Sequence, residues 1–407
     1  MLTMENTLAL ILAGGVGSRL SPLTRDRTKP AVPFGGKYRI IDFTLSNCLH
    51  SGVHRILVLT QYKSHSLQKH LRDGWSIFNP EMGKYITMVP PQMRTGADWY
   101  AGTADSIYQN IYLIERNDAE YILILSGDHI YRMDYAALLE QHRETGADVT
   151  VACMEVPISD ASGFGILDIN DDLHIIEFAE KPARPKPFKQ NPESALASMG
   201  IYVFSRKKLL QALRSDHENE ESTHDFGKDI LPGLIHDFHV CAYMFGGHQG
   251  RVIPDRYWRD VGTVDAYYEA NMDLLKPLPS INLYQTDWYI RTYQAQTPPA
   301  RTVPGESGTE GIFINSMLAS GVIISGGSVH HSILFPMVYV GDESYIEESI
   351  LFTDVRVGRD VKIRKTIIDK HVVVPDGTTI GYDVELDRER FTVSENCVVV
   401  VPKGYQF

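Results

Sequence analysis

Short apolar runs alternate with amphipathic stretches over the first 275 residues of the chain. The runs that predict strands are Leu8–Leu12, Arg55–Leu59, Tyr121–Leu125, Val149–Met154, Ile175–Phe178 and Ile201–Phe204. The stretches that predict helices are Asp105–Arg116, Tyr135–Thr145 and Lys207–Leu213. This alternation predicts an α/β domain over residues 1–275, with a Rossmann-like, mainly parallel sheet covered on both faces. Ligands bind such sheets beyond the carboxyl ends of the strands.

The pattern changes after residue 275. Residues 276–310 contain prolines and aromatic residues without periodicity, which predicts a linker. Trp288 and Tyr289 indicate that this linker packs along a neighbouring surface, because such side chains are unlikely in a free tether.

From about residue 320 the apolar positions recur every 17 residues. The series are Ile323, Val340, Val357 and Val374; Val329, Ile346, Ile363 and Ile380; and Val338, Val355 and Val372. Within a repeat, apolar positions lie five or six residues apart, which is typical of a parallel β-helix with three short faces per coil. A β-sandwich would instead show strict period-two alternation. The spacing therefore predicts a β-helix of about four coils over residues 311–407.

Composition and charge narrow the classes of function. The chain has 39 basic and 51 acidic residues, and a net charge of −12 disfavours nucleic acid or an anionic membrane as a partner. No run reaches the roughly 20 apolar residues of a membrane span, and the N-terminus shows no signal peptide, so we expect a cytoplasmic protein. Four widely separated cysteines predict buried reduced thiols rather than a disulfide or zinc framework: Cys48, Cys153, Cys241 and Cys397. The histidines show no metal-ligand spacing either.

The first strand ends in a glycine-rich segment, residues 13–20. Glycines let the backbone approach a ligand and direct N–H groups at phosphate oxygens, although a tight turn is the alternative explanation. The segment is neither a Walker loop nor a G-x-G-x-x-G dinucleotide pattern. Arg19 and Lys29 follow it and would supply the two cations that a wrapped triphosphate needs.

Eight ordered motifs carry a resemblance to a known family. They are Leu10–Pro30, which follows L-A-G-G-x-G-x-R-L-x-P-L-T-x(4)-K-P, and then Gly35–Phe43, Trp99–Asp105, Ser126–Tyr131, Phe178–Pro182, Ala197–Phe204, His224–Asp229 and Trp258–Thr263. Together they resemble the sugar-phosphate nucleotidyltransferases, and within them the bacterial glucose-1-phosphate adenylyltransferases. The resemblance covers nearly the whole chain and implies a left-handed β-helix after the catalytic domain.

The resemblance implies a reaction of ATP with glucose 1-phosphate that yields ADP-glucose and pyrophosphate. It implies Arg19, Lys29, Asp128 and Asp260 as catalytic residues, with Asp128 and Asp260 holding Mg²⁺. The nucleotide site it implies comprises Ala13, Gly14, Gly15, Gly17, Arg19, Lys29, Gln61, Gly102 and Asp105. The glucose 1-phosphate site it implies comprises Tyr100, Gly165, Glu180, Lys181, Ser198, Tyr202, Asp225, Phe226 and Trp258.

The position of Asp128 supports the metal assignment independently. Asp128 directly follows a predicted strand, at the ligand-binding edge of the sheet. A carboxylate there suits Mg²⁺, a hard cation that binds oxygen and usually shares substrate phosphates. Capping of a turn is the alternative for Asp128, and core packing is the alternative for Tyr202 and Phe226.

The resemblance also implies a homotetramer under allosteric control by a metabolite bound between the two domains. Arg39 and Arg116 match the enteric-type pattern, but other positions depart from it: Val16, Asp26, Pro33 and Ala101. The identity and sign of an effector are therefore left open. Three alternatives stay open as well: a UDP-, dTDP- or GDP-sugar pyrophosphorylase, a non-catalytic regulatory subunit, and a β-helix acyltransferase.

Overall fold

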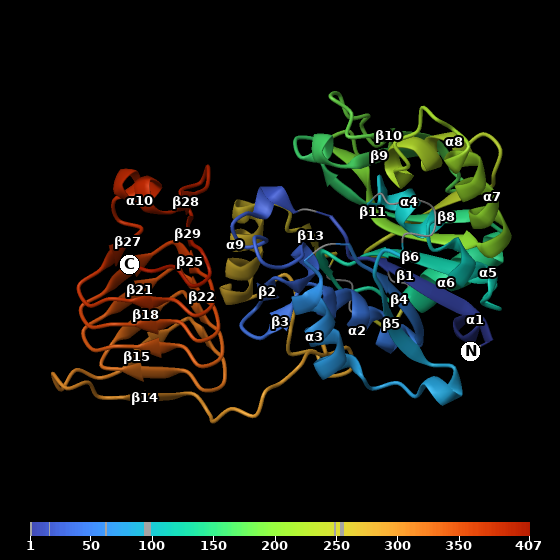
Figure 1. Cartoon of the computed structure of the whole chain (residues 1–407). Helices are drawn as coiled ribbons and strands as arrows, with labels where there is room; N and C mark the ends of the chain where they lie inside the picture. The colour runs from blue at the N-terminus through green and yellow to red at the C-terminus, as the bar shows by residue number, and fades with distance from the viewer. Residues whose placement is uncertain (1, 16, 62, 93–98, 248–249, 253–255) are drawn as a thin grey trace.

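The chain folds into an N-terminal domain and a C-terminal stack of short strands, joined by an extended segment (Figure 1). The structure, a computed structural model, describes residues 2–15, 17–61, 63–92, 99–247, 250–252 and 256–407. The α-helices in this part of the chain are α1 (Leu2–Glu5), α2 (Ile41–Ser51), α3 (His65–Trp75), α4 (Thr103–Tyr108), α5 (Ile111–Glu115), α6 (Tyr135–Thr145), α7 (Arg206–His217), α8 (Leu231–Leu234), α9 (Val264–Met272) and α10 (Val384–Arg390). Within the described ranges, none of them is long and apolar enough to cross a membrane.

A mixed sheet forms the centre of the N-terminal domain. Its order is β10-β9-β11-β6-β1-β4-β5, and β8 pairs with β11 and with β12. The strands are β1 (Thr7–Leu12), β4 (Arg55–Leu59), β5 (Tyr85–Val89), β6 (Tyr121–Ser126), β8 (Val149–Pro157), β9 (Gly165–Ile169), β10 (Ile175–Glu180), β11 (Ser194–Ser205) and β12 (Val240–Met244). The block β5-β4-β1-β6 is parallel, as the sequence predicts for the core, whereas β11 runs antiparallel to β6 and β8.

Alternate side chains of the parallel strands enter two hydrophobic cores, one on each face of the sheet. In β1, Leu8 and Leu10 belong to one core, and Ala9 and Ile11 belong to the other. Helices α4, α5, α7 and α8 contribute to the first core, and α2, α3 and α6 contribute to the second. Burial on both faces explains why these strands are almost continuously apolar in the sequence.

One predicted helix is interrupted. The structure divides Asp105–Arg116 into α4 and α5, with a break at Asn110. The buried Asn110 amide donates to the Ser106 carbonyl and to the Tyr100 hydroxyl, at 2.9 Å each. A side chain that hydrogen-bonds to the nearby backbone competes with the hydrogen bonds of the helix. The prediction of one continuous helix was therefore wrong.

The C-terminal strands form three sheets that the chain visits in turn, and all their strand pairs are parallel except the last, in which β28 runs antiparallel to β29. The first contains β14 (Arg301–Val303), β17 (Ile323–Ser325), β20 (Tyr339–Val340), β23 (Arg356–Val357) and β26 (Val373–Val374). The second contains β15 (Ile312–Ile314), β18 (Ser328–His330), β21 (Tyr345–Glu347), β24 (Lys362–Arg364) and β27 (Thr379–Ile380). The third contains β16 (Met317–Leu318), β19 (Ile333–Leu334), β22 (Ile350–Leu351), β25 (Thr366–Ile368), β29 (Val399–Val401) and β28 (Thr392–Val393). This arrangement is the predicted parallel β-helix.

In the first coil, the spacing between paired strands is 16 residues instead of the predicted 17. Val340 pairs with Ile324, not with Ile323, and Ile324 is fully buried. Val329 follows Ile324 by five positions, whereas their partners Val340 and Ile346 are six positions apart, so the corner before β18 is one residue shorter, and it contains Gly326 at a φ of 70°. The left-handed conformation that glycine adopts readily allows this tighter corner.

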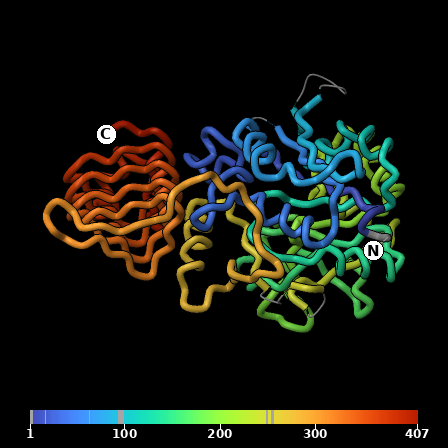
Figure 2. Tube along the Cα trace, turned by 90° about the horizontal axis from the view of Figure 1, so that it is seen from below, coloured from blue at the N-terminus to red at the C-terminus, as the bar shows by residue number. Residues whose placement is uncertain are grey.

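The β-helix begins inside the predicted linker. Strand β14 pairs with β17, so we propose a start near residue 301 instead of 311. Residues 276–300 run over the N-terminal domain before they reach the stack (Figure 2). Within this segment the buried Trp288 donates its indole N–H to Asn47 Oδ1 at 3.1 Å, and the Arg291 Nε donates to the Gly74 carbonyl at 3.2 Å. The segment packs as Trp288 predicts.

The two parts share a hydrophobic core. It combines Phe34, Phe43 and Tyr267 of the N-terminal part with Phe335 and Phe352 of the β-helix. A bidentate ion pair reinforces this contact: Arg27 Nη1 and Nη2 each lie 2.9 Å from an oxygen of Asp369, and both residues are buried.

Candidate active site

The glycine-rich segment turns at the carboxyl end of β1. Gly15 has a φ of 103° and Gly17 a φ of 60°, conformations that favour glycine. A Cβ at Gly15 would meet no atom within 4 Å, so space lies open above this backbone, while one at Gly17 would lie 3.1 Å from Thr24. The Thr24 hydroxyl donates to the Gly17 carbonyl at 2.8 Å and so fixes the loop. Ala13 and Gly14 continue the segment from β1, and Val16 lies outside the described residues.

The two predicted metal ligands lie together although they are far apart in the sequence. Asp128 follows β6, and Asp260 ends β13 (Trp258–Asp260). Strand β13 runs antiparallel to β7 (His129–Tyr131), and this pairing sets Asp260 opposite His129. The Lys29 ammonium lies 2.9 Å from Asp128 Oδ2 and 2.7 Å from Asp260 Oδ1. The structure thus brings Lys29, Asp128 and Asp260 into one ion cluster.

The charges of this cluster hold one another ionised. Burial would raise the pKa of Asp128, but Lys29 and then His129 outweigh it and hold that pKa well below its usual range. Burial would likewise lower the pKa of Lys29, but Asp128 and Asp260 outweigh it and raise that pKa above its usual value. Arg19 is exposed, and its guanidinium lies near Asp260. A Cβ placed on Gly262 would be 3.3 Å from Arg19 Nη2 and 3.1 Å from Asp260 Oδ1.

His129 belongs to this cluster, although the sequence analysis assigned it no role. Its Nε2 lies 3.6 Å from Asp128 and 4.0 Å from Asp260, and these three side chains converge closely enough to hold a metal ion. The ring of Trp258 packs edge-on against His129, with 5.0 Å between centroids. The buried Trp258 Nε1 has no hydrogen-bond partner among the described residues. The motif around Asp128 contained the signal for His129.

Glu180 and Lys181 lie at the end of β10, beside the predicted Gly165. A Cβ at Gly165 would lie 2.8 Å from Glu180 Oε2, and one at Gly227 would lie 2.5 Å from the same oxygen. These two glycines therefore form the space that the Glu180 carboxylate occupies. The Lys181 side chain is 60% exposed, its ammonium lies 2.7 Å from Glu180 Oε1, and its backbone φ is 46°. Gly227 was absent from the sequence-based predictions.

The predicted aromatic residues of the sugar site are buried. Tyr202 and Phe226 belong to a hydrophobic core, with ring centroids 5.8 Å apart. Burial raises the pKa of Tyr202, and a hydrogen bond with Ser198 opposes that shift. Both rings therefore pack in the core, which was the alternative explanation for Tyr202 and Phe226.

Asp225 and Gly102 connect the sugar site with the loop before α4. The Thr103 hydroxyl donates to Asp225 Oδ2 at 2.9 Å, and the Gly227 N–H donates to Asp225 Oδ1 at 3.0 Å. A Cβ at Gly102 would lie 2.1 Å from the His224 carbonyl oxygen, so only glycine allows this approach of the two backbones.

The other predicted nucleotide residues form a neighbouring group. Gln61 lies against Gly14, 3.5 Å from a Cβ placed there, and its amide donates to the Tyr100 carbonyl at 3.3 Å. Asp105 accepts hydrogen bonds from the Ala101 N–H at 2.8 Å and the Gln109 amide at 2.9 Å. The contacts of Asp105 are local, so it shapes the loop that contains Tyr100.

Known proteins resemble this chain over nearly its whole length. Residues 8–277 match the nucleotidyl transferase model, and residues 298–401 match the GlmU-like, C-terminal hexapeptide model, consistent with a left-handed β-helix. Glucose-1-phosphate adenylyltransferase 2 of Vibrio cholerae is 61% identical over 404 residues, which cover 99% of each chain. Glucose-1-phosphate adenylyltransferase of Hydrogenovibrio crunogenus is 49% identical, covering 98% of this chain and 93% of the relative. Enzymes of the nucleotidyl transferase family generally use a divalent metal ion. The chain is therefore a nucleotidyltransferase and belongs to the glucose-1-phosphate adenylyltransferase family.

Proposed function

We propose that the enzyme joins ATP and glucose 1-phosphate to form ADP-glucose and pyrophosphate, and so supplies ADP-glucose for glycogen synthesis. The observation that carries this proposal is the convergence of Lys29, Asp128 and Asp260 beside the glycine-rich segment. The names of the relatives support the choice of substrates.

The reaction needs positioning and charge neutralisation. A phosphate oxygen of glucose 1-phosphate attacks the α-phosphorus of ATP in line, the bond to the bridging oxygen breaks, and pyrophosphate leaves. The attacking oxygen is already anionic, so no general base is required. Arg19 and Lys29 would neutralise the triphosphate, and Lys181 would hold the sugar phosphate. Glu180 would accept hydrogen bonds from sugar hydroxyls.

We propose Mg²⁺ as the divalent metal, held by Asp128 and Asp260. The ammonium of Lys29 lies between these carboxylates, where their combined charge favours a cation. Carboxylate oxygens are the donors that Mg²⁺ prefers, which supports this fit. When bound, Mg²⁺ would neutralise charge on the α-phosphate and the sugar phosphate together.

We also propose a regulatory anion site between the two domains of a cytoplasmic homotetramer. A cavity of about 230 Å³ lies there, lined by residues that include Arg39, Lys69, His70 and Lys370. Burial lowers the pKa of Lys370 to about 7, and the nearby Arg39 and Arg27 add to this effect. All four cysteines are free, which supports a reducing compartment; three are buried as predicted, but Cys397 is exposed, so the prediction of a buried thiol there was wrong.

The direct test is pyrophosphate release from glucose 1-phosphate with ATP, UTP, dTTP or GTP, each with Mg²⁺. We expect release chiefly with ATP. Release chiefly with UTP or dTTP would identify a different sugar-nucleotide pyrophosphorylase. Absence of release with every nucleotide, from folded protein, would favour a regulatory subunit.

A further inference from the structure

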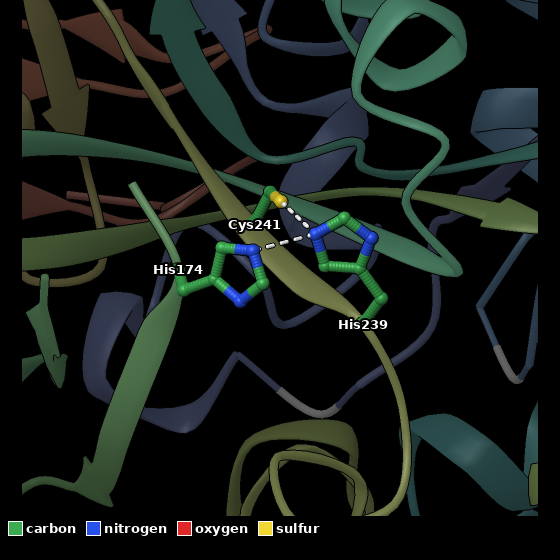
Figure 3. Close-up of side chains that lie close together, drawn as sticks. All are labelled: His174, His239 and Cys241. Atoms are coloured by element: carbon green, nitrogen blue, oxygen red, sulfur yellow. Dashed lines mark hydrogen bonds between the residues drawn. The ribbon is translucent and has the colours of Figure 1, made fainter. Parts of the chain in front are cut away.

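Three side chains with metal-binding atoms converge away from the Asp128–Asp260 cluster: His174, His239 and Cys241 (Figure 3). The Nε2 atom of His239 lies 2.7 Å from His174 Nε2 and 3.2 Å from Cys241 Sγ. The three ligand atoms all lie within 4.8 Å of one another. The imidazole rings stack, with 4.2 Å between their centroids.

The backbone holds these side chains at a seam of the sheet. His239 and Cys241 are two residues apart at the start of β12, so their side chains point to the same face. His174 precedes β10 and forms an isolated β-bridge with Cys241. The Ala242 N–H donates to the Leu173 carbonyl at 2.8 Å, again joining β12 to the turn before β10. The cluster therefore lies where β10 and β12, which are not neighbours in the strand order, meet.

Hydrogen bonding alone does not account for every close contact in this cluster. A neutral imidazole nitrogen carries either one proton or one lone pair, so it makes one good hydrogen bond. The Nε2 atom of His239 nevertheless has two polar neighbours at hydrogen-bond distance. A cation at the centre would accept a lone pair from both nitrogens and from the sulfur.

We propose that His174, His239 and Cys241 form a binding site for a Zn²⁺-type transition-metal cation. Two nitrogens and a thiolate are typical Zn²⁺ ligands, whereas Mg²⁺ prefers oxygen. Tetrahedral zinc bonds place two nitrogens roughly 3.3 Å apart and a nitrogen and a sulfur roughly 3.6 Å apart. The two separations from His239 Nε2 would open by about half an ångström, and the stacked rings would rotate so that both nitrogen lone pairs face the ion. Binding releases the thiol proton, because the thiolate is the ligand.

The proposed ion would hold the start of β10 against β12 and would take no part in the reaction. Strand β10 begins beside His174 and ends at Glu180, so the two residues are about 20 Å apart along an extended strand. The ion would thus anchor the start of the strand whose end carries the sugar-site residues Glu180 and Lys181. Sequence spacing gave no indication of this site, because the third ligand comes from a separate segment.

The test uses the full chain, stripped of metal by a chelator and then titrated with Co²⁺ in excess Mg²⁺. We expect stoichiometric Co²⁺ binding with a sulfur-to-cobalt charge-transfer band in the near ultraviolet, and displacement of Co²⁺ by Zn²⁺. In Cys241→Ser the band should disappear. In His174→Gln the Zn²⁺ affinity should fall more than about 100-fold, because mutating even a residue that hydrogen-bonds to a metal ligand lowers metal affinity about 10–100-fold. The matched control, Cys397→Ser, removes an exposed thiol and should keep both properties.

Two spectroscopic results would overturn the proposal. One is a wild-type protein without the charge-transfer band, and the other is a band that Cys241→Ser leaves unchanged. Thermal unfolding gives a second readout: Zn²⁺ should raise the melting temperature of the wild type and of Cys397→Ser, but not of folded Cys241→Ser. An equal rise in Cys241→Ser would also contradict the site.

Discussion

At the scale of single residues, one ammonium between two carboxylates keeps the active site charged over a wide pH range. Because the pKa of Asp128 is lowered on folding, its stabilising contribution is present above its unfolded pKa and is lost as the pH falls through the folded one. Because the pKa of Lys29 is raised, its contribution is present below its unfolded pKa and is lost as the pH rises through the folded one. Neither group changes charge near neutrality.

Neutralising either carboxylate should abolish most turnover and keep the fold. Asp128→Asn and Asp260→Asn remove a charge from the proposed metal site, so we expect kcat to fall by roughly a thousandfold or more, since metal ions supply several kcal/mol to the transition state. Steady-state kinetics and circular dichroism measure this. The control, Asp118→Asn, changes an 82% exposed carboxylate and should keep normal kcat. Near-normal kcat in either folded site variant would refute the metal assignment.

Lys181 should act on the sugar phosphate and not on the nucleotide. Lys181→Gln removes an exposed ammonium beside Glu180, so we expect the KM for glucose 1-phosphate to rise at least tenfold. A rise of that size corresponds to the loss of about one charge-assisted hydrogen bond to the substrate. The KM for ATP should change little. Lys186→Gln serves as control, because Lys186 pairs with Asp168 and Glu177 instead. A raised KM for ATP alone would reverse the assignment.

The sequence predicted individual residues best where a motif carried them. Asp128 and Asp260 were predicted and lie together. His129 was missed although it belongs to the same motif as Asp128, because its approach to Asp260 depends on the pairing of β7 with β13, which is remote in sequence. Gly227 was missed for a similar reason: its need for a small side chain arises only from Glu180 across the pocket.

At the scale of elements, periodicity predicted the strands of the sheet and the coils of the β-helix. It failed where a local exception interrupts the period, at Asn110 between α4 and α5 and at the shortened corner before β18. A hydrogen-bonding side chain and a single-residue deletion in a corner do not change the surrounding pattern, so periodicity could not reveal either.

The Arg27–Asp369 ion pair should couple the β-helix to the active site, because Arg27 lies two residues before Lys29. Asp369→Asn leaves a buried guanidinium without its counter-charge, so we expect a loss of about 3–5 kcal/mol in unfolding free energy, with lowered kcat. Denaturant unfolding and kinetics measure both. The exposed pair Arg359–Glu306 is the control, and Arg359→Gln should leave the unfolding free energy nearly unchanged. Unchanged stability in Asp369→Asn would contradict this coupling.

At the scale of the whole molecule, the β-helix and the catalytic domain form one packed unit with a basic cavity between them. The two domains share the core that contains Phe34 and Phe352, and Pro33, four residues after Lys29, lines the cavity. We therefore expect an anion bound there to act on the loop that carries Lys29. The sequence predicted two domains and their order. It could not predict this cavity, since residues from both domains line it.

Anion binding in this cavity should strengthen as the pH falls through about 7, because Lys370 gains its charge there. The other charged groups that act on Lys370 are Arg27, Arg39, Asp369 and Lys403. Since the folded pKa is lower than the unfolded one, the same group makes the free energy of unfolding rise with pH above about 7. Calorimetric titration with sulfate, which keeps its charge over this range, measures the affinity. Lys370→Gln should abolish the pH dependence, and its persistence in that variant would contradict the assignment.

Adenylyl transfer is tested most directly by tracing the α-phosphorus of ATP into the products. With ATP labelled at the α-phosphorus and unlabelled glucose 1-phosphate, we expect the label in ADP-glucose and none in pyrophosphate. Formation of labelled ADP-glucose should require a divalent metal ion and should be lost in folded Asp260→Asn. Label in any other product, or unchanged labelled ADP-glucose in Asp260→Asn, would contradict adenylyl transfer at the Asp128–Asp260 site.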